Sequence, residues 1–266
     1  MCNITNQIEI LNNICPLEKG YKNTKRLVRQ RFFENIETEI QAYLLGFYVA
    51  DGSLNDKRNT LRIHINNEDL EIVELFKTFI SPDAPVKQLN KIDYVTSENR
   101  TIRTKESVQI DISNKILAAS LNKLGYESNK TYKELHLPKL NDKLIIHFIR
   151  GYFDGDGCFT YCVRKPNIKN REKNYRISAN INFVSKTKTL LNEIADFLTR
   201  FKIKATVYYQ QRCDCYRLYI SSKESIKRFY ELLYSNSNYY LKRKFEKLNH
   251  HVNTEVTQLI NEYRNA

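Results

Sequence analysis

Glycine is scarce in this 266-residue sequence, and its few glycines are unevenly placed. The chain has 7 Gly, 1 Met and no Trp, and five of the seven glycines fall within residues 44–52 and 149–157. Glycine is used where the backbone adopts an unusual conformation or approaches another backbone closely. The two windows are therefore the first places to search for special structure.

Long apolar runs are also missing. No stretch approaches the ~18 apolar residues that a membrane-spanning helix needs, so we expect no membrane partner. The first residues, MCNITNQIEILNN, lack the basic start and continuous apolar stretch of a secretory signal. With Glu9 and little arginine, they do not resemble a mitochondrial transit peptide either. We expect an intracellular protein, in a bacterial, viral or organellar setting.

The 6 cysteines are expected to be reduced thiols, because disulfides are rare in proteins that are not exported. Cys158 with Cys162 and Cys213 with Cys215 suggest a four-thiolate zinc site, but neither pair has the usual CxxC spacing. Both pairs lie in alternating, strand-like sequence. This favours small buried side chains over metal ligands.

The charge balance is strongly positive. There are 43 Lys+Arg against 30 Asp+Glu, which gives +13 and indicates a polyanionic partner such as nucleic acid. A generally basic composition without such a partner is the alternative. The basic residues gather in blocks at 19–31 and 164–176, which could neutralise phosphates.

Hydrophobic periodicity predicts the same order of elements twice. The first half predicts helices at 37–50, 68–80 and 114–124 and strands at 61–65, 86–95 and 101–112. The second half predicts helices at 142–154, 186–201 and 223–234, strands at 175–184, 203–210 and 215–221, and a final helix at 242–263. The glycine-rich windows are offset by 149 − 44 = 105 residues.

This internal repeat predicts an α+β fold of two αββαββα subdomains with pseudo-two-fold symmetry. The predicted divisions are an N-terminal basic extension at 1–35, a first repeat at 36–141, and a second repeat with the C-terminal helix at 142–266. The extension contains two short helical patterns. It is expected to be a DNA-binding arm, a helix-turn-helix remnant or a packing extension.

The two windows read LLGFYVADG (44–52) and IRGYFDGDG (149–157). Each places small residues at i and i+4, which lie on one helix face and allow two helix backbones to approach closely. The predicted subdomain helix interface therefore consists of Gly46, Ala50, Gly151 and Gly155. Gly52 and Gly157 are expected to end their helices in the left-handed conformation.

An acidic residue lies in the last turn of each predicted helix, Asp51 in the first and Asp156 in the second. A carboxylate there is disfavoured by ~0.3–1 kcal/mol, because the helix C-terminus is already negative. If the helices pack together, the two carboxylates converge, and a hard divalent cation offsets their repulsion. Such a site beside a basic surface is typical of phosphodiester hydrolysis. The simpler interpretation is that each Asp hydrogen-bonds its own turn.

These two windows resemble the two motifs of a single-chain, two-repeat LAGLIDADG homing endonuclease. The segment that leads into and includes the first window is especially similar to that family; it reads FFENIETEIQAYLLGFYVADGSL. The resemblance covers roughly 33–250. It implies two subdomains, each with a curved antiparallel sheet that saddles double-stranded DNA. The sixth motif position, Asp154 in the second copy and Val49 in the first, is expected to be structural. The second position, Leu45 and Arg150, is expected to face away from the helix contact.

The resemblance also implies the site residues. Asp51 and Asp156 would be the catalytic acids and metal ligands, with Ala50 and Gly155 beside them as further metal-site residues. A lysine is expected near each acid: Lys130 in Ser-Asn-Lys-Thr, and Lys242 in Tyr-Leu-Lys-Arg-Lys, with Lys244 as the alternative. Polar residues after the second strand of each repeat are expected to assist; these are Asn67 and Ser185.

Alternation along the strands predicts which side chains face the DNA, since successive residues point to opposite faces of a sheet. Arginine, asparagine and glutamine pair with purine edges in the major groove. The predicted DNA-binding residues are Arg62, His64, Asn66, Gln109, Arg164, Lys165, Lys169, Arg171, Arg176, Ser178, Asn180, Asn182, Tyr208, Gln210, Arg212 and Arg217.

Taken with the resemblance, the sequence predicts a monomeric, Mg²⁺-dependent endonuclease that recognises a long, nearly asymmetric DNA site. Mn²⁺ would replace Mg²⁺, and Ca²⁺ would support binding without cleavage. By the same resemblance the product carries short 3′ overhangs and the gene belongs to a mobile intron or similar element. The main alternative is a non-cleaving RNA maturase or DNA-binding regulator. An intein-type domain is disfavoured, because the chain lacks a splice block and ends Arg264-Asn265-Ala266.

Overall fold

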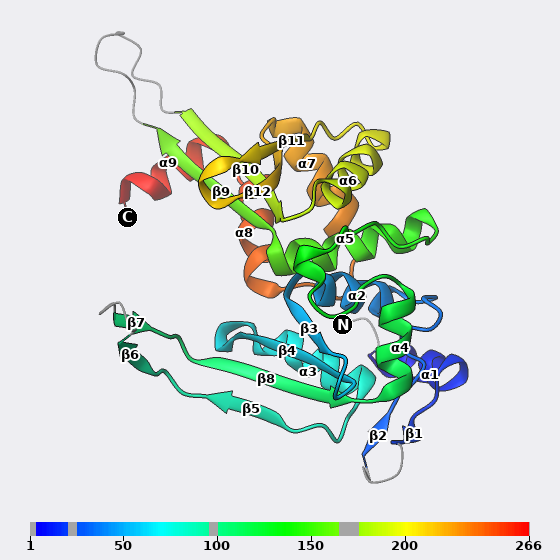
Figure 1. Ribbon diagram of the computed structural model, residues 1–266. Coiled ribbons are helices and arrows are strands. Elements are labelled where there is room, and N and C mark those ends of the chain that lie inside the picture. The colour runs from blue at the N-terminus through cyan, green and yellow to red at the C-terminus, as the bar shows by residue number, and fades with distance from the viewer. Residues whose placement is uncertain (1–3, 21–25, 96–100, 165–175, 266) are drawn as a thin grey trace, which may run out of the picture. The chain divides into compact units, whose positions relative to one another are not determined.

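Figure 1 shows the computed structural model, which describes residues 4–20, 26–95, 101–164 and 176–265. The chain divides into two compact units. Unit 1 consists of Met1–Lys130 and Pro138–Gly155, and unit 2 of Thr131–Leu137 and Asp156–Ala266. The repeat predicted from the sequence begins at 142, whereas the compact units in space divide at the end of the helix that opens the second repeat.

Unit 1 is built on a four-stranded antiparallel sheet of order β3-β4-β8-β5. Its helices are α1 (Ile4–Ile14), α2 (Glu39–Asp51), α3 (Leu70–Ile80), α4 (Lys115–Lys123) and most of α5 (Asp142–Asp156). Its strands are β1 (Glu18–Lys19), β2 (Leu27–Val28), β3 (Gly52–Asn55), β4 (Thr60–Asn66), β5 (Val86–Leu89), β6 (Asp93–Val95), β7 (Thr101–Arg103) and β8 (Ser107–Ser113). Short 3₁₀ turns lie at Asn67–Asp69 and Lys130–Tyr132.

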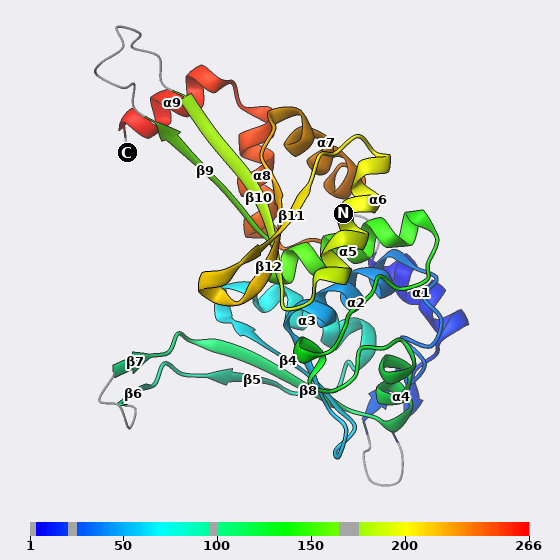
Figure 2. The same ribbon diagram turned by 45° about the horizontal axis from the view of Figure 1, so that its top comes forward.

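Unit 2 contains a second four-stranded antiparallel sheet, of order β11-β12-β10-β9. Its strands are β9 (Cys158–Arg164), β10 (Arg176–Ser185), β11 (Thr206–Gln210) and β12 (Cys215–Ile220). Its helices are α6 (Lys188–Arg200), α7 (Lys223–Tyr234), α8 (Lys242–Asn253) and α9 (Val256–Asn265), with a 3₁₀ turn at Gln211–Cys213. Helices α6 and α7 pack on one face of the sheet (Figure 2).

Both sheets place their strands in the same order along the chain: first, second, fourth, third. In unit 1 the buried face of β4 and β8 (Leu61, Ile63, Ile110 among others) packs on the apolar side of α3. The opposite face of each sheet carries the polar half of the alternation. The predicted α+β fold with two antiparallel sheets is therefore confirmed.

Helix α2 begins where the sequence provides a capping box. The Thr38 side chain accepts a hydrogen bond from the Gln41 backbone, and the Gln41 side chain accepts one from the Thr38 backbone at 3.1 Å. The Gln41 amide also donates to the Phe32 carbonyl at 2.7 Å. Every residue from Ile40 to Val49 is buried, which is typical of a central core helix rather than an amphipathic surface helix.

Helices α2 and α5 touch through their backbones within unit 1. A Cβ at Gly46 would overlap the Phe148 carbonyl, and a Cβ at Gly151 would overlap the Tyr43 carbonyl. Any side chain at either position would force the helices apart. The structure thus places the small residues of both windows at one helix–helix contact.

Polar pairs lie along the same contact. The Arg150 guanidinium is 1% exposed and donates to Glu39 at 2.6 Å, and the Tyr43 hydroxyl donates to the buried Asp154 carboxylate at 2.9 Å. A buried charge left without its partner is strongly destabilising. These pairs therefore restrict how the two helices can pack. The expectation that Arg150 faces away from the helix contact is wrong, because Arg150 reaches Glu39 on the other helix.

Two further sequence expectations are corrected. Gly52 has φ −79° and ψ 160°, and among the described glycines only Gly125 has a positive φ, so neither Gly52 nor Gly157 ends its helix in the left-handed conformation. Instead, α2 passes directly into β3, and a Cβ at Gly52 would overlap the Tyr48 ring. The predicted single helix at 242–263 is two helices, because the backbone is extended at Thr254.

The N-terminal extension packs onto unit 1 in its described part. It contains one helix and a β1–β2 hairpin rather than two helices. Arg29 is 1% exposed, donates to Asn12 at 2.9 Å, and its backbone N–H bonds the Ile80 carbonyl at 2.8 Å. At least this member of the predicted basic block is therefore a structural residue. In the described part of the chain, every helix is too short or too polar to cross a bilayer.

The cysteines only partly follow the expectation of small buried side chains. Cys15 and Cys215 are buried, whereas Cys158, Cys162 and Cys213 are exposed. The exposed ones lie on or beside the polar sheet face of unit 2, where alternation turns them toward solvent.

Adding a methyl group at Gly46 tests the backbone contact. Helix propensity alone favours alanine over glycine by about 1 kcal/mol, but the new Cβ would overlap the Phe148 carbonyl. We expect Gly46→Ala to lower the free energy of unfolding by at least about 2 kcal/mol in urea titrations. Ala119→Gly, at an exposed position of α4, isolates the propensity effect and should cost about 1 kcal/mol. A Gly46→Ala protein as stable as wild type would contradict the contact.

The half-buried His147 on α5 predicts a loss of stability in acid. Burial, assisted by the nearby positive charge of Arg150, lowers the pKa of His147 to about 4 although Glu39 opposes this. The unfolded chain binds this proton near pH 6.5 and the folded chain does not, so stability falls as the pH drops from about 7 toward 4.

The shift corresponds to about 2 kcal/mol between pH 7.5 and 5, which His147→Gln should remove from the pH profile of unfolding. His136 gives a control of opposite sign, because its hydrogen bond to Glu193 raises its pKa. The stability that His136 contributes is present below about pH 6.5 and is lost as the pH rises through its folded-state pKa. An unchanged profile for His147→Gln would refute the assignment.

Candidate functional site

In unit 1 an exposed carboxylate lies at the end of α2, and a buried lysine from a later part of the chain lies beside it. Asp51 is the last helical residue and is exposed, and Gly52 follows it as the first residue of β3. The Lys130 side chain is 7% exposed and donates from Nζ to the Gly52 carbonyl. Asn129 precedes it with a left-handed φ of 56°, and so turns the chain after α4 back toward this helix end.

In unit 2 the same arrangement follows the end of α5. Asp156 is the last helical residue and is exposed, and the buried Lys244 donates from Nζ to the Gly157 carbonyl at 2.6 Å. Lys242, the residue preferred from the sequence, is 69% exposed in its side chain and lies 3.8 Å from Glu246. The reason is helical phase: α8 begins at Lys242, so the residue two positions later points inward.

Lys130 and Lys244 offset the negative charge that accumulates at the two helix ends. Each helix C-terminus is negative, and each also carries an aspartate. A buried ammonium group bonded to the next carbonyl offsets this charge, and a charge-assisted hydrogen bond of this kind contributes ~1.5–3 kcal/mol. Lys130 lies in addition 5.2 Å from the centre of the Tyr48 ring, whose hydroxyl is bonded to the Tyr126 carbonyl at 2.8 Å. The lysine position is therefore fixed by the core.

The Asp51 carboxylate lies against the last turn of α5. A Cβ at Gly155 would overlap Ala50 and would come within 3.2 Å of Asp51 Oδ2. Among the described residues, no three His, Cys, Asp or Glu side chains come together. An exposed carboxylate at a helix end, with the backbone oxygens of that end nearby, fits Mg²⁺, which is commonly held by one or two carboxylates together with substrate phosphates.

The two assisting residues make local hydrogen bonds. The Asn67 backbone N–H donates to the Glu106 carbonyl at 3.1 Å, in the turn after β4. Gly52 pairs with Ile63, and β4 ends at Asn66, the residue before Asn67. The buried Ser185 hydroxyl accepts from the Thr187 N–H at 3.1 Å where α6 begins. These contacts are local, and the assisting role of Asn67 and Ser185 stays a prediction.

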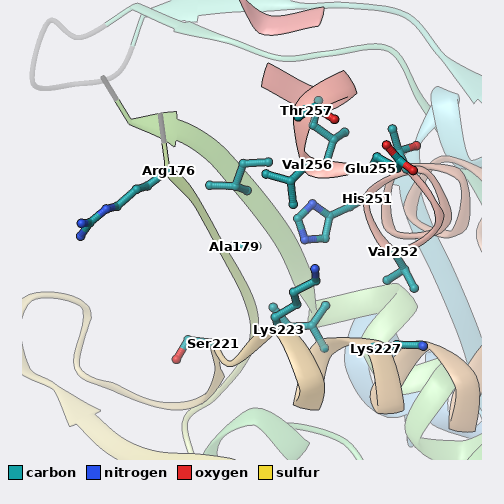
Figure 3. A pocket seen from close by; sticks show the side chains of 14 residues that line it. Arg176, Ala179, Ser221, Lys223, Lys227, His251, Val252, Glu255, Val256 and Thr257 are labelled. Carbon is teal, nitrogen blue, oxygen red and sulfur yellow. The ribbon is translucent and has the colours of Figure 1, made fainter. Parts of the chain in front are cut away.

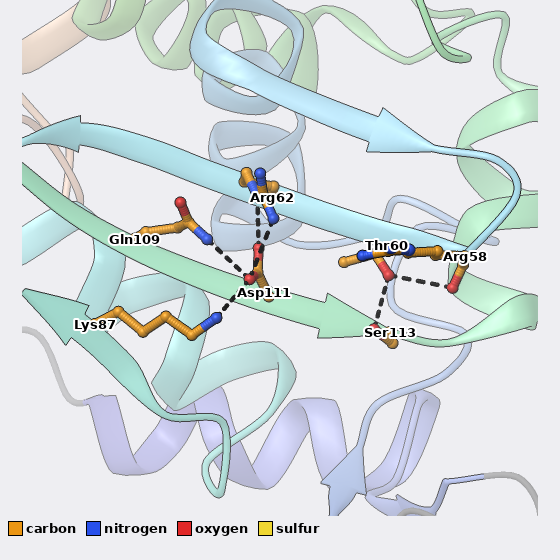
Figure 4. Close-up of polar contacts among 7 residues, drawn as sticks. All are labelled: Arg58, Thr60, Arg62, Lys87, Gln109, Asp111 and Ser113. Atoms are coloured by element: carbon orange, nitrogen blue, oxygen red, sulfur yellow. Dashed lines mark hydrogen bonds and ion pairs between the residues drawn. The ribbon is translucent and has the colours of Figure 1, made fainter. Parts of the chain in front are cut away.

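The polar sheet face of unit 1 carries four of the predicted DNA-binding residues, of which Figure 4 shows Arg62 and Gln109. Arg62 and His64 are exposed; His64 lies 2.9 Å from the Ser107 hydroxyl. Asn66 caps the following 3₁₀ turn by accepting from the Glu68 N–H at 3.1 Å. Gln109 is only 8% exposed and donates to Asp111 at 2.8 Å, so its amide is turned into the sheet surface.

The polar sheet face of unit 2 carries the second group. Opposite pairs in the register place Arg176 beside Arg164, Ser178 beside Cys162 and Asn180 beside Thr160. On the adjoining strands, Asn182 pairs with Tyr219, and Tyr208 pairs with Arg217. Gln210 ends β11, and Arg212 is exposed on the 3₁₀ turn that follows it. Lys165, Lys169 and Arg171 lie outside the described residues.

A separate cavity of about 720 Å³ lies on the other side of the unit 2 sheet (Figure 3). It is bounded by β10, α7 and the α8–α9 region, and His251 projects into it. The His251 ring packs 5.1 Å from the centres of both Phe159 and Tyr161, and burial lowers its pKa. Ile177 and Ala179 line the cavity from the apolar face of β10, and Arg176, at the start of β10, also lines it.

Alternation along the sequence places Asp111 with Gln109 on the polar face of unit 1, but sequence reasoning missed Lys87 and the contacts that Asp111 makes. Both residues lie within 3.0 Å of a partner there: Lys87 bonds Asp111, and Asp111 bonds Arg62. What the sequence does not contain is the register that aligns three strands around this carboxylate.

Comparison with known proteins finds one family model and several solved structures that resemble this chain. Residues 143–234 match the family model described as a LAGLIDADG-like domain. The meganuclease I-SmaMI, in a crystal structure bound to uncleavable DNA, has a TM-score of 0.58 at 12% identity, over 85% of this chain and 97% of that one. That similarity shows the fold.

Two curated proteins of Methanocaldococcus jannaschii also match in sequence. DNA-directed RNA polymerase subunit Rpo1C is 29% identical over 60% of this chain, and reverse gyrase is 33% identical over 46%. The chain spans only 16% and 7% of their respective lengths. The similarity therefore concerns a limited segment of each.

The fold and the repeated helix ends define the class as proteins with the LAGLIDADG homing-endonuclease fold. The chain contains a LAGLIDADG-like domain at 143–234 and has the single-chain, two-unit form of that fold, which confirms the resemblance expected from its two nonapeptides.

Replacing the two buried lysines tests their placement. We expect Lys130→Met and Lys244→Met each to lower the free energy of unfolding by about 1–3 kcal/mol, because a buried carbonyl loses its charged donor. Lys242→Met should change it by no more than about 0.5 kcal/mol, since this side chain is exposed. The measurement is chemical unfolding followed by circular dichroism. Equal effects of Lys242→Met and Lys244→Met would contradict the assignment.

Proposed function

We propose that the protein is a site-specific endonuclease that cuts both strands of a DNA duplex. One observation carries the proposal. In each unit an exposed aspartate lies at a helix end, and the carbonyl of the glycine after it accepts a hydrogen bond from a buried lysine. Lys130 bonds the Gly52 carbonyl beside Asp51, and Lys244 bonds the Gly157 carbonyl beside Asp156. Two like sites on one chain suit the cutting of two strands.

Asp51 and Asp156 would each hold a divalent cation, Mg²⁺ by preference, with the backbone at Ala50 and Gly155 nearby. When bound, such an ion supplies positive charge to the phosphate and lowers the pKa of water for attack. The chain's own part is to fix the geometry. Lys130 and Lys244 hold their ammonium groups in place, where positive charge stabilises the negative charge that develops on the reacting phosphate.

Binding would use the polar sheet faces. With a net charge of +13, the chain should bind duplex DNA through phosphate contacts that weaken steeply with salt. Arg62 and His64 from unit 1, and Asn180, Asn182 and Arg217 from unit 2, are the side chains proposed to read base edges. Since the two faces differ in sequence, the target site would be long and nearly asymmetric, and one chain would suffice to bind it.

The rival function is a non-cleaving RNA maturase or DNA-binding regulator on the same fold. An acid at both helix ends favours the enzyme, because a carboxylate at a negative helix end repels phosphate unless a cation lies between them. Under the proposal, Mn²⁺ replaces Mg²⁺, Ca²⁺ supports binding without cleavage, and the cut leaves short 3′ overhangs, as expected for a mobile genetic element.

Cleavage of a duplex library with Mg²⁺ tests the proposal. Asp51→Asn and Asp156→Asn should each reduce double-strand cleavage by about 10³-fold, since loss of the carboxylate removes several kcal/mol of metal-assisted stabilisation. Binding measured with Ca²⁺ should change by only a few-fold.

Asp196→Asn, at an exposed position of α6, is the matched control and should cleave like wild type. Cleavage that survives in both site variants would overturn the catalytic assignment. Splicing of a bound RNA without any DNA cleavage would instead favour the rival function.

A further inference from the structure

Asp111 stands out by its charge. Within the eight described strands of the two four-stranded sheets it is the only acidic residue. Its side chain lies on the polar face of β8, the face proposed to meet DNA. A carboxylate there repels phosphate, so its presence needs an explanation other than general DNA affinity.

Three donors from three strands converge on this carboxylate (Figure 4). Arg62 of β4 donates from Nε at 2.7 Å and from Nη2 at 3.4 Å. Lys87 of β5 donates at 3.0 Å, and Gln109 of β8 donates at 2.8 Å. The register aligns them, because Arg62 lies opposite Asp111 and Lys87 lies opposite Gln109.

The carboxylate is held in its ionised form. Partial burial would raise the pKa of Asp111, but the hydrogen bonds from Arg62, Lys87 and Gln109 outweigh it and keep the pKa below its ordinary value. Asp111 is 19% exposed in its side chain, whereas Arg62 and Lys87 are 48% and 53% exposed. Exposed ion pairs contribute little to stability, ~0–1 kcal/mol, so folding alone gives little reason for this cluster.

The geometry of Arg62 gives a better reason. A guanidinium group has two bidentate edges, and Asp111 occupies the one formed by Nε and Nη2. The second edge, formed by Nη1 and Nη2, is thereby fixed in direction for a paired acceptor. The O6 and N7 atoms of guanine in the major groove are such a pair. Restraining the side chain in advance lowers the entropy lost on binding.

A hollow of about 350 Å³ lies beside this pair on the same face. Besides Arg62 and Asp111 it is lined by Ser53, Leu54, Asn55, Arg58, Thr60 and Ser113, almost all of them polar. A concave, polar surface next to a restrained arginine suits the edge of a base.

We propose that Asp111 is a positioning residue that fixes Arg62 to read one guanine in the half of the target that meets unit 1. The inference rests on the proposed DNA-binding function. Gln109, predicted to contact DNA, instead supports Asp111, because its amide group donates a hydrogen bond to the Asp111 carboxylate. Lys87 holds the other side of the carboxylate and keeps it from rotating toward the DNA.

Selection of bound duplexes from a randomised library, with the full-length chain and Ca²⁺, tests this. Wild type should prefer guanine at one position of one half-site by about 10-fold or more. Asp111→Asn should reduce that preference to less than about 3-fold, while affinity for random duplex stays equal or rises because a repelling charge is lost. A merely structural role for Asp111 would lower all affinities together.

Arg62→Lys is the second variant, since it keeps the charge but loses the bidentate edge, and it should lose preference at the same position. Glu74→Gln, at an exposed position of α3 and away from the polar sheet face, is the matched acid-to-amide control and should keep the preference. An Asp111→Asn protein that retains the guanine preference overturns the inference but leaves the proposed function intact. A wild-type chain that binds no duplex overturns the proposed function itself.

Discussion

Two helices of unit 1 touch backbone to backbone, and the rest of the site depends on this contact. Gly46 and Gly151 permit it, because a Cβ at either position would overlap a carbonyl of the other helix. The contact sets where α2 stops and β3 begins, and so where Asp51 and the Gly52 carbonyl are presented. The two glycines, which have no side chain, therefore fix the positions from which the side chains at the end of α2 project.

Each unit adds the same charge arrangement to its helix end. A carboxylate at a helix C-terminus is unfavourable for folding, and a buried lysine reduces that cost: Lys130 in unit 1 and Lys244 in unit 2. The chain thus keeps two acids where stability alone would remove them. This conflict between stability and placement is what one expects of residues that serve function, and the function proposed for them is metal-assisted phosphodiester hydrolysis.

The elements that were predicted correctly are those whose signal is local. Neighbouring residues were enough to predict the helix with Asp51 in its last turn. They were also enough to predict the alternation that exposes Arg62. Lys244 could not be separated from Lys242, because the choice depends on where α8 begins and so on which lysine points inward. The role of Asp111 depends on strand register, which no single strand encodes.

The central claim is that the two lysine-capped helix ends are two metal sites of one enzyme. Anomalous diffraction from Mn²⁺ in crystals of the full chain bound to a selected duplex tests it most directly. Mn²⁺ peaks should lie within bonding distance of the Asp51 and Asp156 carboxylates, and the corresponding peak should be lost when either residue is replaced by asparagine. Peaks elsewhere, or DNA bound in Mn²⁺ with no peak at either aspartate, would contradict it.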